Sequence, residues 1–166
     1  MKVIPKRRIM EGKTDYTARK LFLKAGKPRV VFRKTNKYIT GQVTASSGAQ
    51  DRIVASVNSK ELLNHGWPKE WSGSLKSMPA SYLSGYVLGS RALTCGIDSA
   101  ILDIGLNRNV PKSRIYAFVK GAIEAGLKIP CSEKVLPEKS RIEGMHMKKD
   151  IKNVIDKVNA KFKGKK

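Results

Sequence analysis

The stretch Arg29-Val30-Val31-Phe32-Arg33-Lys34-Thr35-Asn36-Lys37-Tyr38-Ile39-Thr40-Gly41-Gln42-Val43 decides how this chain folds. It contains two β-rich runs, and they are joined by residues 34–37, where Asn36 favours a turn. A second polar segment, residues 46–51, leads into a third β-rich run at residues 53–57. The sequence therefore predicts a three-stranded antiparallel meander.

A long helix is expected after the meander, beyond a loop at residues 64–75. Ser77 is a candidate N-cap, apolar residues then recur at helical spacing, and Gly96 supplies a left-handed stop. Gly85 and Gly89 lie four residues apart on this helix. We expect them to allow close packing of the helix on the sheet, because a glycine lets another backbone approach.

One more strand and one more helix follow. Residues 99–104 are typical of a buried strand, and Ser113 is expected to cap a helix over residues 114–125. The order is then β-β-β-α-β-α. Because a helix connects the third and fourth strands, we expect these strands to be parallel, with a right-handed crossover between them. The fold class is α/β, with a mixed sheet and helices packed on it.

The two ends of the chain differ from this central part. Residues 1–28 form a basic N-terminal arm, in which residues 14–24 are expected to form a short helix that Thr14 or Asp15 caps and Gly26 ends. Residues 29–130 form the α/β domain, and residues 131–166 a C-terminal extension with a helix and a Lys-rich tail. The apolar stripe of that helix is Ile151, Val154, Ile155 and Val158.

Positive charge gathers at both ends. The 166 residues include 34 Lys and Arg against 13 Asp and Glu, for a net charge of +21. Residues 1–40 hold 13 of these basic residues and residues 147–166 hold 8, each against two acidic residues. Such ends repel each other unless a polyanion is near. Nucleic acid and an anionic membrane are the candidates, and no basic stretch has the strong apolar face that a membrane surface favours.

Other classes of protein are disfavoured by composition. No apolar run approaches the roughly 18 residues of a membrane-spanning helix, and residues 1–8 lack the apolar stretch of a secretory signal. Two cysteines, Cys95 and Cys131, are too few for a disulfide framework or a four-thiolate zinc site. We therefore expect a cytoplasmic protein that does not bind a membrane.

No catalytic set can be assembled from the sequence. Glycine-rich phosphate loops are absent, and His65 and His146 each lack a partner at ligand spacing. Asp103 ends a strand before a glycine, so a metal-dependent nuclease is an alternative, but such chemistry needs several converging carboxylates. Asp98 and Glu124 are the only other acidic residues near this strand-helix unit, and neither provides a clear second ligand. We expect Asp103 to accept hydrogen bonds from loop backbone or a neighbouring arginine, and we expect no metal and no cofactor.

A basic face remains as the candidate site. It consists of hairpin residues and arm residues that can bind phosphate or stack on bases. The hairpin contributes Arg29, Arg33, Lys34 and Lys37, with Asn36 and Tyr38, and the arm contributes Arg7, Arg8, Lys13, Arg19 and Lys20. The alternative is a solvated strand edge protected by charge, but continuity with an arm of the same sign disfavours it.

Several segments of the chain also resemble one known family. They are Glu11–Tyr16, Lys27–Asn36, Ser59–Leu62, Ala80–Gly85, Leu102–Leu106, Ser113–Ala117, Lys120–Ala122, Ala125–Pro130 and Arg141–His146. Over about residues 5–147 the chain is similar to the archaeal form of the 5S rRNA-binding ribosomal proteins of the large subunit (large-subunit ribosomal protein eighteen). Residues 109–112 stand where that family usually has a glycine before a Ser-Arg pair.

The resemblance implies a function and a set of contacts. It implies an RNase H-like fold without catalysis, binding to 5S rRNA, and attachment of that RNA to the large-subunit rRNA in the central protuberance, beside neighbouring ribosomal proteins. The family's RNA contacts come largely from the arm and the sheet with its loops. By position these are Arg7, Arg8, Lys13, Tyr16, Arg19, Arg29, Arg33, Asn36 and Lys37.

Overall fold

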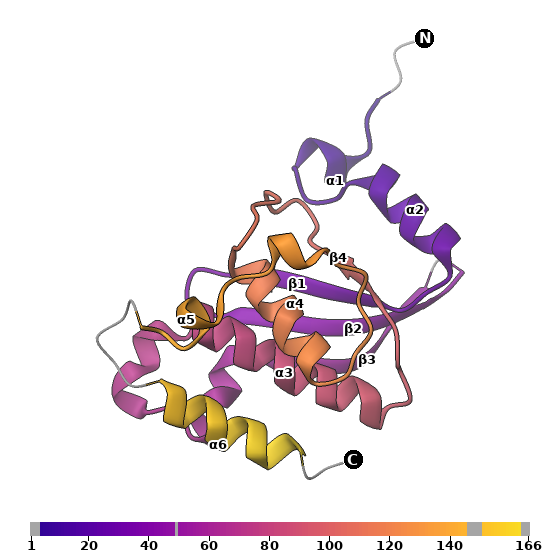
Figure 1. The fold of residues 1–166 in the computed structure, drawn as a ribbon. Helices are drawn as coiled ribbons and strands as arrows, with labels where there is room; N and C mark the ends of the chain where they lie inside the picture. The colour runs from indigo at the N-terminus through magenta and orange to yellow at the C-terminus, as the bar shows by residue number, and fades with distance from the viewer. Residues whose placement is uncertain (1–3, 49, 146–150, 164–166) are drawn as a thin grey trace.

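A computed structural model describes residues 4–48, 50–145 and 151–163 as a four-stranded mixed sheet with helices (Figure 1). The strands are β1 (Arg29–Lys34), β2 (Ile39–Ser47), β3 (Gln50–Asn58) and β4 (Ile101–Asp103). The α-helices are α1 (Arg7–Met10), α2 (Tyr16–Ala25), α3 (Met78–Thr94), α4 (Arg114–Glu124), α5 (Lys139–Ile142) and α6 (Lys152–Lys163). Three short 3-10 helices span Ser59–His65, Lys69–Ser74 and Glu133–Val135.

The sheet has the order β3-β2-β1-β4, which confirms the antiparallel meander. β4 runs parallel to β1 and therefore also in the direction of β3, as the helical crossover predicts. The expected turn lies within residues 46–51 as predicted but is tighter, because Ser46 pairs with Asp51 and Ser47 with Gln50, so that the strands extend up to the turn at Gly48. Backbone pairing does not require apolar side chains, so the hairpin extends through this polar segment.

β4 is shorter and less buried than the sequence predicts. Only three residues of the expected strand 99–104 are strand, and Ile101 and Leu102 are half-buried. β4 pairs with β1 alone at the edge of the sheet, while Ser99, just before β4, forms an isolated parallel bridge with Lys128. Asp103 is the buried residue of this strand.

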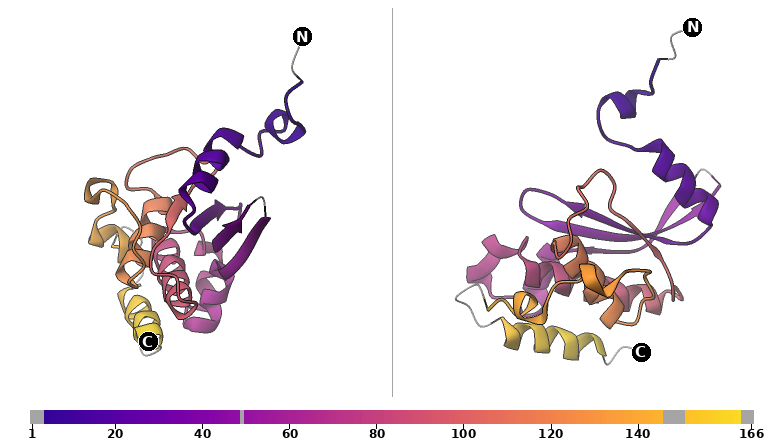
Figure 2. Two further views of the ribbon diagram at one scale, coloured as in Figure 1. Left: turned by 90° about the vertical axis from the view of Figure 1, so that its right-hand side faces the viewer. Right: turned by 45° about the horizontal axis from the view of Figure 1, so that its top comes forward.

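Helices α3 and α4 cover one face of the sheet (Figure 2). Phe32 of β1 packs edge-on against Phe118 of α4, with ring centroids 5.3 Å apart. The two helices also approach each other very closely. A Cβ on Gly85 would lie 1.9 Å from the carbonyl oxygen of Phe118, and one on Gly121 would lie 2.1 Å from that of Tyr82. Gly85 therefore serves contact between helices, which corrects the expected contact with the sheet.

Gly89 has the same role one turn later along α3. A Cβ there would lie 2.8 Å from Cβ of Ala125 and 2.9 Å from the carbonyl oxygen of Ala122, at the end of α4. The expectation that Gly89 packs on the sheet is thus also wrong. The pair of glycines lets two helix backbones meet where ordinary side chains would hold them apart.

Helix ends follow the sequence signals with one exception. Asp15 caps α2, Ser77 caps α3, and Gly26 and Gly96 adopt the left-handed conformation after these helices, with φ of 62° and 78°. Ser113 stands at the N-cap position of α4, but its side chain makes no capping hydrogen bond. The expected cap at this residue is therefore wrong.

The C-terminal helix, the N-terminal arm and the expected loop at residues 64–75 differ in how much of each is buried. The predicted stripe on α6 is buried against α3, and Ile151 and Val158 are fully buried. In the arm, no residue of α1 or α2 is buried, and both helices stand at one end of the sheet (Figure 2). The expected loop at residues 64–75 is mostly 3-10 helix and buries Trp67. His146 and the end of the Lys-rich tail lie outside the described residues.

Candidate nucleic-acid interface

The arm and the edge of the sheet enclose a hollow of about 310 Å³, which we call the arm hollow. The arm lines it with Arg8, Lys13, Arg19 and Phe22, and the sheet with Arg29, Arg33 and residues 102–106. Five of the residues that the sequence predicts to bind RNA thus meet at one place: Arg8, Lys13, Arg19, Arg29 and Arg33.

Among these five residues, Arg29 is the one whose side chain is buried and not accessible to RNA. Its side chain is 5% exposed, and its guanidinium lies 2.9 Å from Asp51 and 3.2 Å from Asp103. A third contact joins it to the hydroxyl of Ser46 at 3.3 Å. Because a buried charge must be paired, Arg29 stabilises the fold, and the expectation that it lies on the exposed basic face is corrected.

Asp103 has the environment that the sequence predicts for a structural carboxylate. One of its oxygens accepts the backbone N–H of Gly105 at 2.8 Å, and the other accepts from Arg29. Arg33 lies 3.6 Å from the first oxygen and donates to the carbonyls of Phe32 and Asp103. Loop backbone and neighbouring arginines therefore occupy both carboxylate oxygens.

Asp51 joins the arm to the sheet through two ion pairs. The sequence does not indicate this role, because Asp51 lies in a segment that is predicted to be a polar turn. It lies 3.0 Å from Arg19 of α2 and 2.9 Å from Arg29 of β1. Partial burial acts to raise the pKa of Asp51, but hydrogen bonds from Ser46 and Arg29 and the charges of Arg29 and Arg19 outweigh it. The pKa of Asp51 is therefore lowered, and the carboxylate keeps its charge.

The other arm residues keep their charged groups in solvent. Arg8 donates from Nε to the hydroxyl of Thr14 at 2.9 Å, and Lys13 pairs with Glu11 at 2.8 Å. Arg7 lies 3.6 Å from Glu11 and is 79% exposed. Exposed pairs of this kind contribute little to stability, so these cations can exchange their partners for phosphates.

The remaining predicted residues lie away from the arm hollow. Tyr16 begins α2, and Lys6 Nζ lies 4.5 Å from the centre of its ring. Lys34 ends β1, and Asn36 and Lys37 are exposed in the turn that follows. The backbone carbonyl of Asn36 accepts from Lys76 Nζ at 2.7 Å, which fixes this turn against the start of α3.

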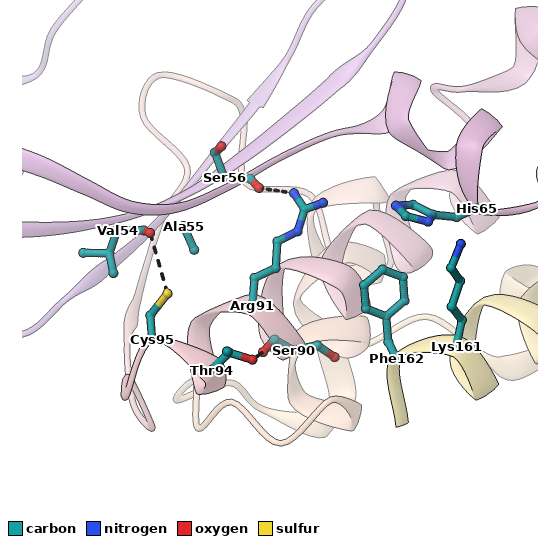
Figure 3. Close-up of a pocket in the computed structure, with 10 residues that line it drawn as sticks. All are labelled: Val54, Ala55, Ser56, His65, Ser90, Arg91, Thr94, Cys95, Lys161 and Phe162. Carbon is teal, nitrogen blue, oxygen red and sulfur yellow. Dashed lines mark hydrogen bonds between the residues drawn. The ribbon is translucent and has the colours of Figure 1, made fainter. Parts of the chain in front are cut away.

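Another hollow, of about 460 Å³, lies between β3, α3 and α6 (Figure 3). It contains Cys95 and His65, which could in principle form a nucleophile and base. Figure 3 shows them on opposite sides of the hollow with Arg91 between them. Cys95 Sγ faces the carbonyl of Val54 at 3.8 Å, and the ring of His65 packs edge-on against Phe162 at 5.0 Å. Cys95 and His65 are therefore not arranged for proton transfer between them.

The described residues provide neither a metal-binding cluster nor a membrane-spanning helix. In residues 4–48, 50–145 and 151–163, no three His, Cys, Asp or Glu side chains are grouped so that they could hold a metal ion. Within the same residues, no helix is both long enough and apolar enough to cross a membrane.

Fold and surface together define an α/β protein with a polycationic arm, a class suited to binding polyanions. The family model described as ribosomal large subunit proteins 60S L5 and 50S L18 matches residues 2–99. The chain is 46% identical over 141 residues to large ribosomal subunit protein uL18 of Korarchaeum cryptofilum, covering 85% of this chain and 70% of that protein. It is 42% identical over 144 residues to uL18 of Halobacterium salinarum, covering 87% and 76%.

Methanospirillum hungatei has a relative of the same name that is 45% identical over 141 residues, covering 85% of this chain and 78% of that protein. The chain belongs to the family of large-subunit ribosomal proteins uL18, in its archaeal type. It is therefore a structural protein of the large ribosomal subunit, and its place is in the ribosome, in the cytoplasm.

Proposed function

We propose that this protein binds 5S rRNA and attaches it to the large-subunit rRNA in the central protuberance, without catalysing a reaction. Membership in the uL18 family supports an rRNA partner and neighbouring ribosomal proteins. The observation that carries the proposal is the arm itself. It has many cations and little buried surface, so RNA supplies the counter-charges that the arm lacks within the chain.

In this proposal the arm and the hairpin turn share the RNA contacts. Arg7, Arg8, Lys13, Arg19 and Arg33 bind phosphates around the arm hollow, and Tyr16 stacks on an unpaired base. Lys34, Asn36 and Lys37 bind at the other end of β1. Arg29 does not touch RNA, and it holds Asp51 and Asp103 so that Arg19 and Arg33 are correctly placed.

The division of the chain belongs to the same proposal. Residues 1–28 act as the binding arm, residues 29–130 as the α/β domain, and residues 131–166 as an extension. An antiparallel meander with a parallel strand added beside β1 supports a relationship to RNase H-like folds. Both oxygens of Asp103 are engaged by Gly105 and arginines, which supports a structural role for this residue over the nuclease alternative.

A variant with Arg7, Arg8 and Lys13 replaced by Gln tests the proposal. A matched control replaces three other lysines, Lys60, Lys69 and Lys128, by Gln. These lysines are exposed and line neither the arm hollow nor the hollow in Figure 3. Both variants lose the same charge. We expect the arm variant to bind 5S rRNA at least tenfold more weakly than the control in a filter-binding assay at fixed salt. Equal affinities would refute the assignment of the arm.

A further inference from the structure

A second basic hollow lies at the N-terminal end of α4. Its volume is about 430 Å³, and we call it the α4 hollow. Five cationic side chains line it: Lys34, Arg108, Lys112, Arg114 and Arg141. No acidic residue of the described chain is among its lining residues. The cations come from β1, the loop before α4, α4 itself and α5, so the fold brings them together from distant parts of the sequence.

The charges in the α4 hollow are mostly unpaired. Lys112 lies 3.0 Å from Glu138, and both side chains are more than half exposed. Hydrogen bonding from Lys112, then its charge and that of Arg141, lower the pKa of Glu138. Among the described residues, the side chains of Lys34, Arg108, Arg114 and Arg141 form no ion pair or hydrogen bond. In the arm hollow, in contrast, Arg19, Arg29 and Arg33 have ionic partners in Asp51 and Asp103.

The start of α4 adds to the positive potential. Its first turn contains no acidic residue, and Lys112 and Arg114 flank the N-cap. The N-terminal end of a helix carries partial positive charge, so cations there oppose the helix dipole. The fold therefore concentrates positive charge at a place where an anion is needed to offset it.

Ser113 is the second observation that points to a ligand. Its hydroxyl oxygen is buried and has no hydrogen-bond partner within the described residues, although the side chain lines the hollow. It also leaves the first N–H groups of α4 without the cap that Ser77 gives to α3. A buried hydroxyl without a partner is costly, so a group that accepts its hydrogen bond is expected.

We propose that the α4 hollow binds a backbone phosphate of RNA. Guanidinium groups of Arg108, Arg114 and Arg141 can each offer two parallel hydrogen bonds, and the Ser113 hydroxyl can donate to a further phosphate oxygen. The inference depends on the proposed function only in taking RNA as the polyanion. It adds a second contact on the face of β1 opposite the arm hollow, since successive residues of a strand point to opposite faces.

The sharpest test compares two serines at equivalent helix positions. Ser113→Ala removes a hydroxyl that makes no cap, so we expect the Tm to stay unchanged and RNA affinity to fall about tenfold. Ser77→Ala removes a real cap, so we expect the Tm to fall by about 2–4 °C and RNA affinity to stay unchanged. The probes are 5S rRNA and a transcript of the large-subunit rRNA, each measured at one fixed salt concentration.

A charge variant provides the second measurement. This variant replaces the three arginines of the α4 hollow, Arg108, Arg114 and Arg141, by Gln. It is compared with the control variant in which Lys60, Lys69 and Lys128 are replaced by Gln. We expect the first variant to lower the slope of log affinity against log salt by about one or more for the RNA whose phosphate occupies the hollow. The RNA for which this variant lowers the salt dependence of binding is the RNA that supplies the phosphate.

The results distinguish a failure of the proposed function from a failure of the α4 hollow proposal. If wild type binds neither RNA, the proposed function fails. If wild type binds RNA and both the Ser113 and the arginine variants bind as their controls do, the α4 hollow proposal fails alone. If these variants instead lose affinity only for an acidic peptide such as poly-glutamate, the hollow binds a protein and the proposal is again wrong.

Discussion

Arg33 and Lys34 are consecutive residues of β1, but their side chains line different hollows. Arg33 faces the arm and is engaged by Asp103 and by the carbonyl of Phe32. Lys34 faces the start of α4 and has no ion pair within the described chain. The alternation of a β-strand thus distributes the basic charge of one hairpin over both sides of the sheet.

Acid should loosen the arm through Asp51. Folding lowers the pKa of this carboxylate below its value in the unfolded chain, about 3.9. The carboxylate therefore contributes its full stabilisation at pH values above the unfolded pKa, and this stabilisation is lost as the pH falls toward the folded pKa. We expect Asp51→Asn to cost about 1–2 kcal/mol at pH 6, and the difference from wild type to shrink toward pH 3. Urea unfolding at several pH values measures it.

Asp98→Asn is the control for this prediction, because Asp98 is exposed and forms no ion pair among the described residues. It should change the free energy of unfolding by less than about 0.5 kcal/mol at either pH. A constant deficit of the Asp51 variant from pH 6 to pH 3 would contradict the assigned charge interaction.

Asp103→Asn separates a structural carboxylate from a catalytic one. The change leaves the buried Arg29 with only Asp51 as an ionic partner, so we expect a loss of about 2–3 kcal/mol in unfolding free energy. RNA incubated with Mg²⁺ or Mn²⁺ should remain intact with either protein. Cleavage by wild type that disappears in the variant would support the nuclease alternative.

Gly85→Ala should disrupt the contact between α3 and α4. The new Cβ would lie 1.9 Å from the Phe118 carbonyl oxygen, so the helices must separate, at a cost of about 3 kcal/mol or more. Gly73→Ala is the control, since nothing lies within 4 Å of a Cβ there. We expect it to change stability by less than about 0.5 kcal/mol. Similar thermal unfolding of the two variants would rule out the close helix contact.

The sequence predicts elements whose signals are local. The meander, the caps at Asp15 and Ser77 and the stripe on α6 all rest on residues near one another in the chain, and the structure confirms them. The partner of Gly85 is predicted wrongly, as the sheet, because its contact is Phe118 of a later helix, which no local signal indicates.

At the candidate site, too, the sequence predicts local features but not contacts between residues far apart in the chain. The sequence places a basic face on the arm and hairpin, but not the pairing of Arg29 with Asp51 and Asp103, which are 22 and 74 residues away in the chain. It also treats Ser113 as an ordinary cap. The signal that could have drawn attention there is the presence of Lys112 and Arg114 where a helix favours acidic residues.

Removing residues 1–8 tests the division of labour between arm and body. In the described part of this segment every residue is exposed, so the Tm should change by no more than about 2 °C. RNA binding should weaken, because Lys2, Lys6, Arg7 and Arg8 are lost as phosphate partners. Thermal unfolding and 5S rRNA affinity of the full and shortened chains check both points. A large fall in Tm with unchanged affinity would reverse the assignment.

The most direct measurement is the affinity of the full chain for 5S rRNA, against an unrelated RNA of equal length, as salt rises from about 50 to 200 mM. With about 6–10 phosphate contacts, by analogy with DNA, we expect binding to weaken by about 10³–10⁵. We also expect 5S rRNA to remain the preferred ligand throughout. Affinity that does not depend on salt, or that is equal for the two RNAs, would contradict the proposal that this protein is a 5S rRNA-binding component of the large subunit.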